Sequence, residues 1–328
     1  MYEALMPGSA HRPRLAVARA STAVAARASI ALVAYVPLLL TAPGVVVADT
    51  KSYLTIDPSR LLSRAWSMWD PSIGAGTVTH QNIGYLWPLG PWYWTFERLG
   101  VPDWIAQRLW LGTIIALAGY GTVWLLRTLG WRGPEVWGAA MLYALTPYVL
   151  SVAARLSVLL LPFAALPWLI AIAHRALRER GWRWPAAFAL VVTTVGSVNL
   201  TALVLAGVGP ALYVGWSIGT GEVRVRKALA ATARTGLLTA LVSLWWLAGL
   251  WVQGGWGLDV LAYTETAEVV ARTSSAHEVL RGLGYWFFYG GDKLGPWIEP
   301  GRSYTQELWL IAVGFAVPVL AVASAVLV

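Results

Sequence analysis

The chain has 328 residues, of which 58% are hydrophobic and only 12% are charged, and its mean hydropathy is +0.60. These values exclude an ordinary soluble globular protein and indicate a membrane protein. The absence of cysteine excludes disulfide bonds and thiolate chemistry. The net charge of +8 does not point to a nucleic-acid partner, because its distribution along the chain follows membrane topology.

Apolar runs close to the length of a bilayer span predict an all-α polytopic membrane protein. They lie near residues 28–48, 104–126, 135–153, 156–173, 185–199, 201–218, 235–251 and 306–328. The fifth and sixth runs are short, so they form either a tight hairpin or one broken helix. The same two readings apply to the third and fourth runs. The last run continues to the final residue, so we expect further helices beyond it.

Basic residues set the orientation. Residues 1–27 form a basic N-terminus that we expect in the cytoplasm, followed by an uncleaved first helix rather than a signal peptide. With eight spans, the short inner segments carry 14 Lys and Arg against four acids. The two large loops, 49–103 and 252–305, carry 8 Lys and Arg against 11 acids and therefore face outward. The membrane domain accordingly covers residues 28–328, and the chain is predicted to be a multi-pass protein of the plasma membrane.

The first loop opens with Asp49 and Lys51, a carboxylate and an ammonium at the mouth of a hydrophobic helix. A charged side chain in this position is costly unless it is solvated, paired or functional. We therefore expect this pair to have a functional role. The spacing suits a carboxylate general base with a cation nearby for an anionic leaving group. The alternative is a helix end with a lysine that reaches the lipid head groups.

The rest of the first loop is polar and aromatic. Residues 57–69 have apolar positions at helical spacing after Pro58, which predicts an amphipathic helix on the outer membrane surface. His80, Gln81 and Asn82 follow in a flexible polar turn whose side chains can hydrogen-bond to sugar hydroxyls. The aromatic segment after this turn is typical of interfacial anchoring, with sugar stacking as the alternative.

Several stretches resemble a known family. They are Asp49-Thr50-Lys51, Pro58-Ser59-Arg60-Leu61-Leu62-Ser63-Arg64, Trp69-Asp70-Pro71, Gly84-Tyr85-Leu86-Trp87-Pro88-Leu89-Gly90-Pro91 and Val101-Pro102-Asp103-Trp104-Ile105-Ala106-Gln107-Arg108-Leu109-Trp110. Together they are similar to the actinobacterial alpha-(1→3)-arabinofuranosyltransferases, which are membrane enzymes of the GT-C glycosyltransferase class. The resemblance continues into the second outer loop. It implies a GT-C-like transmembrane helix bundle, and it implies C-terminal carbohydrate-binding domains that this sequence does not contain.

The second loop carries further charged candidates. Glu265 and Glu268 are spaced to share one helix face and form a second acidic position across the cavity from Asp49. Arg272, Arg281 and Lys293 are the cations available to a lipid phosphate. Glu278 fits a capping box with Ser275 and is therefore predicted to be structural.

No His, Asp and Glu cluster has the spacing of metal ligands, so the sequence does not indicate a metal. A carboxylate pair such as Asp49 with Glu268 can still hold a divalent cation through water.

The resemblance implies a decaprenyl-phosphoryl arabinose donor, an arabinan acceptor on arabinogalactan or lipoarabinomannan, and inversion at the anomeric carbon. On this basis Asp49 is the expected base, and Glu268 or Glu265 orients sugar hydroxyls. Lys51, Arg272 and Arg281 would lie near the phosphate. Three alternatives remain: another polyprenyl-phosphate GT-C enzyme such as a mannosyltransferase, a lipid-linked sugar transporter or flippase, and a non-catalytic scaffold. No internal repeat of the kind found in transporters is present.

Overall fold

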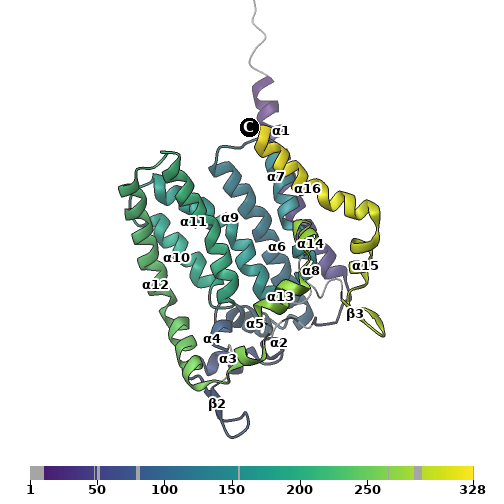
Figure 1. Cartoon of the computed structure of the whole chain (residues 1–328), viewed down its shortest axis with the longest axis vertical. Coiled ribbons are helices and arrows are strands. Elements are labelled where there is room, and N and C mark those ends of the chain that lie inside the picture. Colours follow the sequence, from purple (N-terminus) through teal and green to yellow (C-terminus); the bar gives the residue numbers. More distant parts are fainter. Residues whose placement is uncertain are drawn as a thin grey trace, which may run out of the picture.

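The computed structural model of the chain describes residues 11–47, 49, 52–78, 82–153, 156–264, 266–283 and 290–327. This part of the chain is a helix bundle with two short antiparallel hairpins (Figure 1). The long helices are α1 (His11–Leu40), α6 (Asp103–Thr128), α9 (Ser157–Arg178), α10 (Arg183–Val195), α11 (Leu200–Gly219), α12 (Val225–Trp256) and α16 (Leu308–Leu327). The predicted all-α membrane fold is confirmed.

Shorter elements connect the long helices. The short helices are α2 (Tyr53–Ile56), α3 (Pro58–Ser63), α4 (Asn82–Tyr85), α5 (Leu89–Arg98), α7 (Glu135–Ala144), α8 (Pro147–Ala153), the 3₁₀ turn η1 (Val260–Tyr263), α13 (Ala267–Thr273), α14 (Ala276–Leu280) and α15 (Glu299–Gln306). The strands are β1 (Trp69–Asp70) with β2 (Thr77–Val78), and β3 (Gly291–Asp292) with β4 (Gly295–Pro296).

Each of the eight predicted apolar runs contains a helix, but the first run is helical only as far as Leu40 and the fifth only as far as Val195. By length and composition, five described helices can cross a membrane, with α7 and α8 counted together over Glu135–Ala153. The pair α15 and α16, bent by 76°, brings the number to six. The remaining two runs contain the shorter apolar helices Val24–Leu40 and Arg183–Val195. The run at 185–199 is thus a helix of its own, which turns back at once into α11.

The centre of the bundle is α6, which packs against α1, α7 and α9, while α9 also contacts α10 and α11. Small residues allow the close approach of α6 to α1. A Cβ atom at Gly112 would lie 2.3 Å from the Tyr35 ring, and one at Gly119 would lie 2.9 Å from Ile30. A hydrogen bond of 2.9 Å between the hydroxyls of Tyr35 and Thr113 joins the same two helices.

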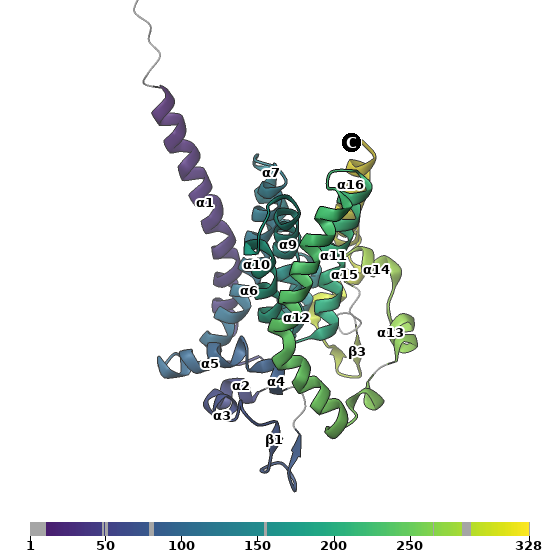
Figure 2. The same ribbon diagram turned by 90° about the vertical axis from the view of Figure 1, so that its left-hand side faces the viewer.

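The short helices α2 to α5 and the β1–β2 hairpin gather at the end of the bundle opposite the C-terminus (Figure 2). Both outer loops meet there. Val78 of β2 forms a β-bridge with Gly257, directly after α12, and Gly249 of α12 leaves room for Ile83 of α4. The Ser197 hydroxyl at the α10–α11 turn donates hydrogen bonds to the carbonyls of Gly84 and Trp87. The polar first loop is therefore fastened to the ends of three membrane helices.

The helix predicted over 57–69 is wrong beyond Ser63. Asp57 caps α3 by accepting a hydrogen bond of 2.9 Å from the Arg60 amide. The chain then leaves the helix, because Arg64 turns to bind Asp70 at 2.7 Å and to donate to the Trp69 carbonyl. A two-stranded hairpin starts at this point, and the apolar spacing past Ser63 belongs to that turn rather than to a helix.

Candidate active site

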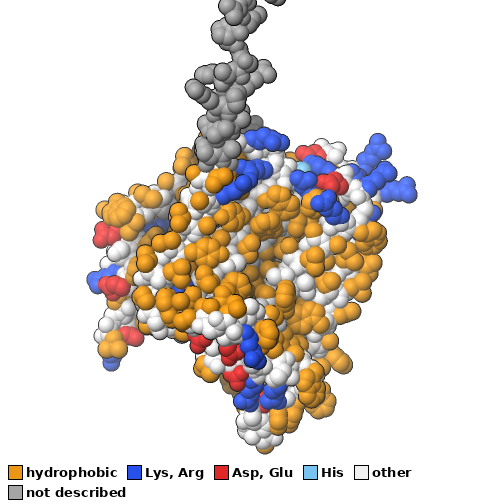
Figure 3. Space-filling view, turned by 180° about the vertical axis from the view of Figure 1, so that it is seen from behind, with side chains coloured by type: hydrophobic (Ala, Val, Ile, Leu, Met, Phe, Trp, Pro, Cys, Tyr) orange, Lys and Arg blue, Asp and Glu red, His pale blue; other side chains and the backbone are white. Residues whose placement is uncertain are grey.

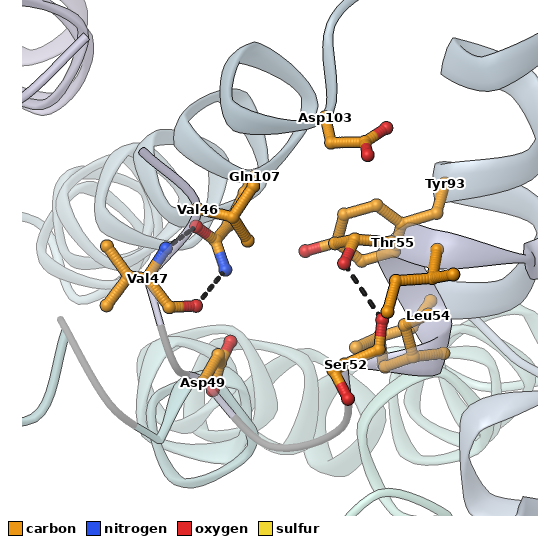
Figure 4. A pocket seen from close by; sticks show the side chains of 11 residues that line it. Val46, Val47, Asp49, Ser52, Leu54, Thr55, Tyr93, Asp103 and Gln107 are labelled. Atoms are coloured by element: carbon orange, nitrogen blue, oxygen red, sulfur yellow. Dashed lines mark hydrogen bonds between the residues drawn. The ribbon is translucent and has the colours of Figure 1, made fainter. Parts of the chain in front are cut away.

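A buried polar pair at the start of α6 positions the segment that leads to Asp49. The Gln107 side chain accepts a hydrogen bond from the Val47 amide and donates one to the Val47 carbonyl, both at 2.8 Å (Figure 4). Arg108 donates to the Val45 carbonyl at 3.1 Å. Gln107 and Arg108 are only 2% and 4% exposed. These contacts hold the chain after α1 across the N-terminal end of α6.

Asp49 is anchored at the N-terminus of α9. Its Oδ1 atom accepts a hydrogen bond of 2.9 Å from the backbone amide of Ser157, the first residue of that helix. Free amides and the positive end of the helix dipole favour a carboxylate there. Burial nevertheless raises the pKa of Asp49 above its ordinary value of 3.8, against the Ser157 hydrogen bonds, which lower it. Asp49 is therefore a positioned carboxylate that accepts a proton more readily than a solvated aspartate.

A cavity of about 490 Å³ opens beside Asp49. Its polar lining residues are Asp49, Ser52, Thr55, Tyr93, Asp103 and Gln107, and its apolar ones are Val46, Val47, Leu54, Ile56 and Leu89. Figure 4 shows the Tyr93 hydroxyl directed between Asp103, Gln107 and Asp49. Burial, followed by the charges of Asp49 and Asp103, raises the pKa of the Tyr93 phenol, which stays protonated. The cavity thus combines two carboxylates and a phenol in a small, partly apolar space, which is typical of ligand sites.

Asp103, Tyr93 and Gln107 were not among the site residues predicted from the sequence. Asp103 shares the feature that marked Asp49 as a candidate, because it is a carboxylate at the end of a long apolar helix. Tyr93 and Gln107 have no such signal, since one belongs to an aromatic stretch and the other is an isolated amide. Their roles depend on the packing of α5 against α6.

The predicted residues of the second loop that the structure describes are absent from the lining of this cavity; they are Glu268, Arg272, Arg281 and Lys293. Glu268 and Arg272 form an exposed ion pair of 2.6 Å with each other on α13. Arg281 is buried and binds Glu278 at 3.0 and 3.1 Å, and it also donates to the Tyr304 carbonyl.

The predicted capping box is wrong, because the Ser275 side chain makes no capping hydrogen bond at the start of α14. Glu278 is structural through a buried ion pair with Arg281 instead.

The other candidates lie elsewhere. Lys293 is exposed at the turn of the β3–β4 hairpin, and Asn82 is the first residue of α4. Lys51, His80, Gln81 and Glu265 fall outside the described residues, so their assignments stay predictions. Of the predicted site residues that the structure describes, Asp49 alone lines the cavity. Within the same part of the chain, no group of three His, Asp or Glu side chains is placed to hold a metal ion.

An all-α bundle with several helices able to cross a bilayer and a carboxylate-lined cavity at one end defines a polytopic membrane protein. The sequence model of the "Alpha-(1->3)-arabinofuranosyltransferase, N-terminal GT-C domain" matches residues 33–325. The chain therefore belongs to this family, as its sequence motifs predicted.

Relatives and solved structures agree with the family match. The chain is 35% identical over 250 residues to the alpha-(1→3)-arabinofuranosyltransferase of Mycobacterium tuberculosis, covering 74% of this chain and 17% of the relative. It is 31% identical over 261 residues to that of Mycolicibacterium smegmatis, covering 78% and 18%. The cryo-EM structure of the arabinofuranosyltransferase AftD from mycobacteria superimposes with a TM-score of 0.68 at 30% identity, covering 80% of this chain and 19% of that one. The chain thus spans less than a fifth of each relative's length.

Proposed function

We propose that the protein is the membrane-embedded GT-C part of an inverting alpha-(1→3)-arabinofuranosyltransferase. It would transfer arabinofuranose from decaprenyl-phosphoryl arabinose to arabinan of arabinogalactan or lipoarabinomannan. The observation that carries this proposal is the partly buried carboxylate of Asp49, which α9 holds at the edge of a cavity in a chain of this family.

The proposed mechanism is a single displacement. A hydroxyl oxygen of the acceptor forms a bond to the anomeric carbon of the donor, and the bond from that carbon to the phosphate oxygen breaks. The proton of the hydroxyl moves to Asp49, and the electron pair of the broken bond leaves with the polyprenyl phosphate. A β-linked donor gives an α-linked product in this way. A raised pKa suits Asp49 to the task, because a base is most effective when its pKa approaches the working pH.

The proposed location is the plasma membrane, with the cavity on the outer side. The inner segments of this topology are rich in Lys and Arg, whereas the loop that covers the cavity carries more acids than bases. A donor that is anchored by its lipid tail would then reach Asp49 from the outer leaflet. Lys51 stays a predicted phosphate ligand in this arrangement.

The test is transfer of labelled arabinose from decaprenyl-phosphoryl arabinose to a synthetic α-linked arabinan acceptor. The full-length protein is compared with its Asp49→Asn variant. We expect the variant to lose transfer by about 10²–10⁴-fold, which is the usual contribution of a general base. The matched control is Asp259→Asn, because Asp259 is exposed in the second loop and does not line the cavity.

Equal transfer by the wild type and Asp49→Asn would exclude Asp49 as the base and move that role to Glu268 or Glu265. Decaprenyl-phosphoryl mannose serves as a second donor in the same assay. Transfer of mannose in place of arabinose would contradict the proposed donor.

A further inference from the structure

The described lining of the cavity beside Asp49 is acidic. Its ionisable residues are Asp49, Asp103 and Tyr93, and no Lys or Arg is among the lining residues that the structure describes. Two carboxylates repel a phosphate, which needs cationic or amide donors. The described arginines of the second loop do not supply them here. Arg272 is paired with Glu268, Arg281 is paired with Glu278, and Arg302 donates to Gln306 on its own helix. The cavity therefore suits an uncharged ligand that donates hydrogen bonds.

The position of Tyr93 also indicates a ligand site in this cavity. Its side chain is 5% exposed, and its hydroxyl is directed into the cavity (Figure 4). It forms no hydrogen bond to the residues that the structure describes. A phenol whose ring is buried and whose hydroxyl opens into a cavity is placed to hydrogen-bond to a group that enters it.

The other polar lining groups are largely occupied. Both polar atoms of the Gln107 amide bind the backbone of Val47, and the Thr55 hydroxyl donates to the Ser52 carbonyl at 2.9 Å. Asp103 forms no ion pair or hydrogen bond with the described residues. Among the described lining residues, the carboxylates of Asp49 and Asp103, the phenol of Tyr93 and the hydroxyl of Ser52 are therefore the groups left to bind a ligand.

We propose that Asp103 and Tyr93 bind the hydroxyls of the acceptor sugar next to Asp49, so that this cavity is the acceptor subsite and the donor phosphate lies outside it. The inference rests on the proposed function, because a base must touch the hydroxyl that it deprotonates, and this places the acceptor at Asp49. A carboxylate accepts hydrogen bonds from two sugar hydroxyls at once, and a phenol both donates and accepts. Asp103 and Tyr93 are positioning residues for the acceptor rather than proton acceptors.

The experiment is a steady-state analysis of the full-length enzyme with Asp103→Asn and Tyr93→Phe. The concentrations of the synthetic arabinan acceptor and of the lipid donor are varied separately. We expect the acceptor KM to rise about tenfold or more in Asp103→Asn, since a hydrogen bond to a charged group is lost, and roughly threefold in Tyr93→Phe. The donor KM stays the same in both variants. The matched controls Asp259→Asn and Tyr263→Phe change exposed residues of the second loop and leave both constants unchanged.

An unchanged acceptor KM in both variants, or a rise confined to the donor KM, would overturn the assignment while the proposed function stands. Loss of transfer in the wild type would instead overturn the proposed function. In that case, calorimetry measures the binding of the arabinan oligosaccharide to the wild type and to Asp103→Asn. The assignment of Asp103 to the acceptor requires weaker binding by the variant. If Asp103→Asn is not recovered in folded form, Tyr93→Phe carries the test, because it removes one oxygen from an otherwise unchanged side chain.

Discussion

Asp49 shows how two opposing effects set the chemistry of one residue. Burial disfavours its charged form, whereas the hydrogen bonds from Ser157 favour it. Burial is the larger effect, so the folded protein holds a proton on Asp49 at a higher pH than an unfolded chain does. Burial therefore makes the Asp49 carboxylate a stronger base, and the hydrogen bond from the first residue of α9 keeps that carboxylate in place.

This balance predicts the pH dependence of transfer. Asp49 acts as a base only when it is deprotonated, so kcat/KM falls as the pH falls through its folded pKa, which lies above the ordinary 3.8. Ser157→Ala removes the hydroxyl bond that lowers this pKa and moves the acidic limb to higher pH. The measurement is the pH profile of kcat/KM for wild type, Ser157→Ala and Ser243→Ala, another buried serine, located on α12. If the acidic limb of the kcat/KM profile moved to lower pH in Ser157→Ala, the Ser157 hydroxyl could not be what lowers the pKa of Asp49.

At the level of elements, a single arginine joins the second outer loop to the last helix. Arg281 follows α14, binds Glu278 within the loop and donates to the Tyr304 carbonyl of α15. Its guanidinium lies 5.8 Å from the Phe315 ring centre, and Gly314 leaves the space for it on α16. Removing one partner of a buried ion pair is strongly destabilising, because the other charge then stays buried without a partner.

We therefore expect Arg281→Ala to destabilise the segment α14–α16 by about 3–5 kcal/mol. Limited proteolysis of the second outer loop measures this change. Arg272→Ala is the matched control, because its pair with Glu268 is exposed and contributes about 1 kcal/mol or less.

The double variant Glu278→Gln with Arg281→Met removes both charges, and we expect it to retain more stability than Arg281→Ala and to retain transfer. Loss of transfer in a stable double variant would instead support the phosphate-binding role that the sequence suggested for Arg281.

At the level of the whole molecule, the distribution of side chains matches a protein that crosses a bilayer. Apolar side chains cover the middle of the surface in Figure 3, Lys and Arg gather towards one end, and charges of both signs surround the opposite tip. The cavity lies at the end where α2 to α5 collect, away from the C-terminus (Figure 2). This arrangement leads to the prediction that the cavity faces outward.

The lack of cysteine allows a direct test of the orientation. Ile73, between β1 and β2, is 52% exposed, and Thr220 is exposed at the turn from α11 to α12. We expect a membrane-impermeant maleimide to label Ile73→Cys in intact spheroplasts and to label Thr220→Cys only after lysis. The reverse pattern would place the cavity in the cytoplasm and exclude the proposed access from the outer leaflet.

Much of the protein was predictable from its sequence. The helical membrane fold follows from the length and spacing of the apolar runs, because a bilayer accepts few structures other than helices of that length. The family follows from local motifs such as Asp49-Thr50-Lys51. Asp49 was recognised because a charge at the mouth of an apolar helix is unusual whatever the fold.

The tertiary structure decided which other residues share the cavity with Asp49. Periodicity and charge placed Glu268 and Arg281 among the site residues, yet these side chains bind neighbours three or four positions away. Tyr93, Asp103 and Gln107 come to Asp49 from α5 and α6, across more than 40 positions of sequence. Spacing within one helix predicts which of its side chains can pair with each other. Which side chains line a cavity depends instead on how separate helices pack.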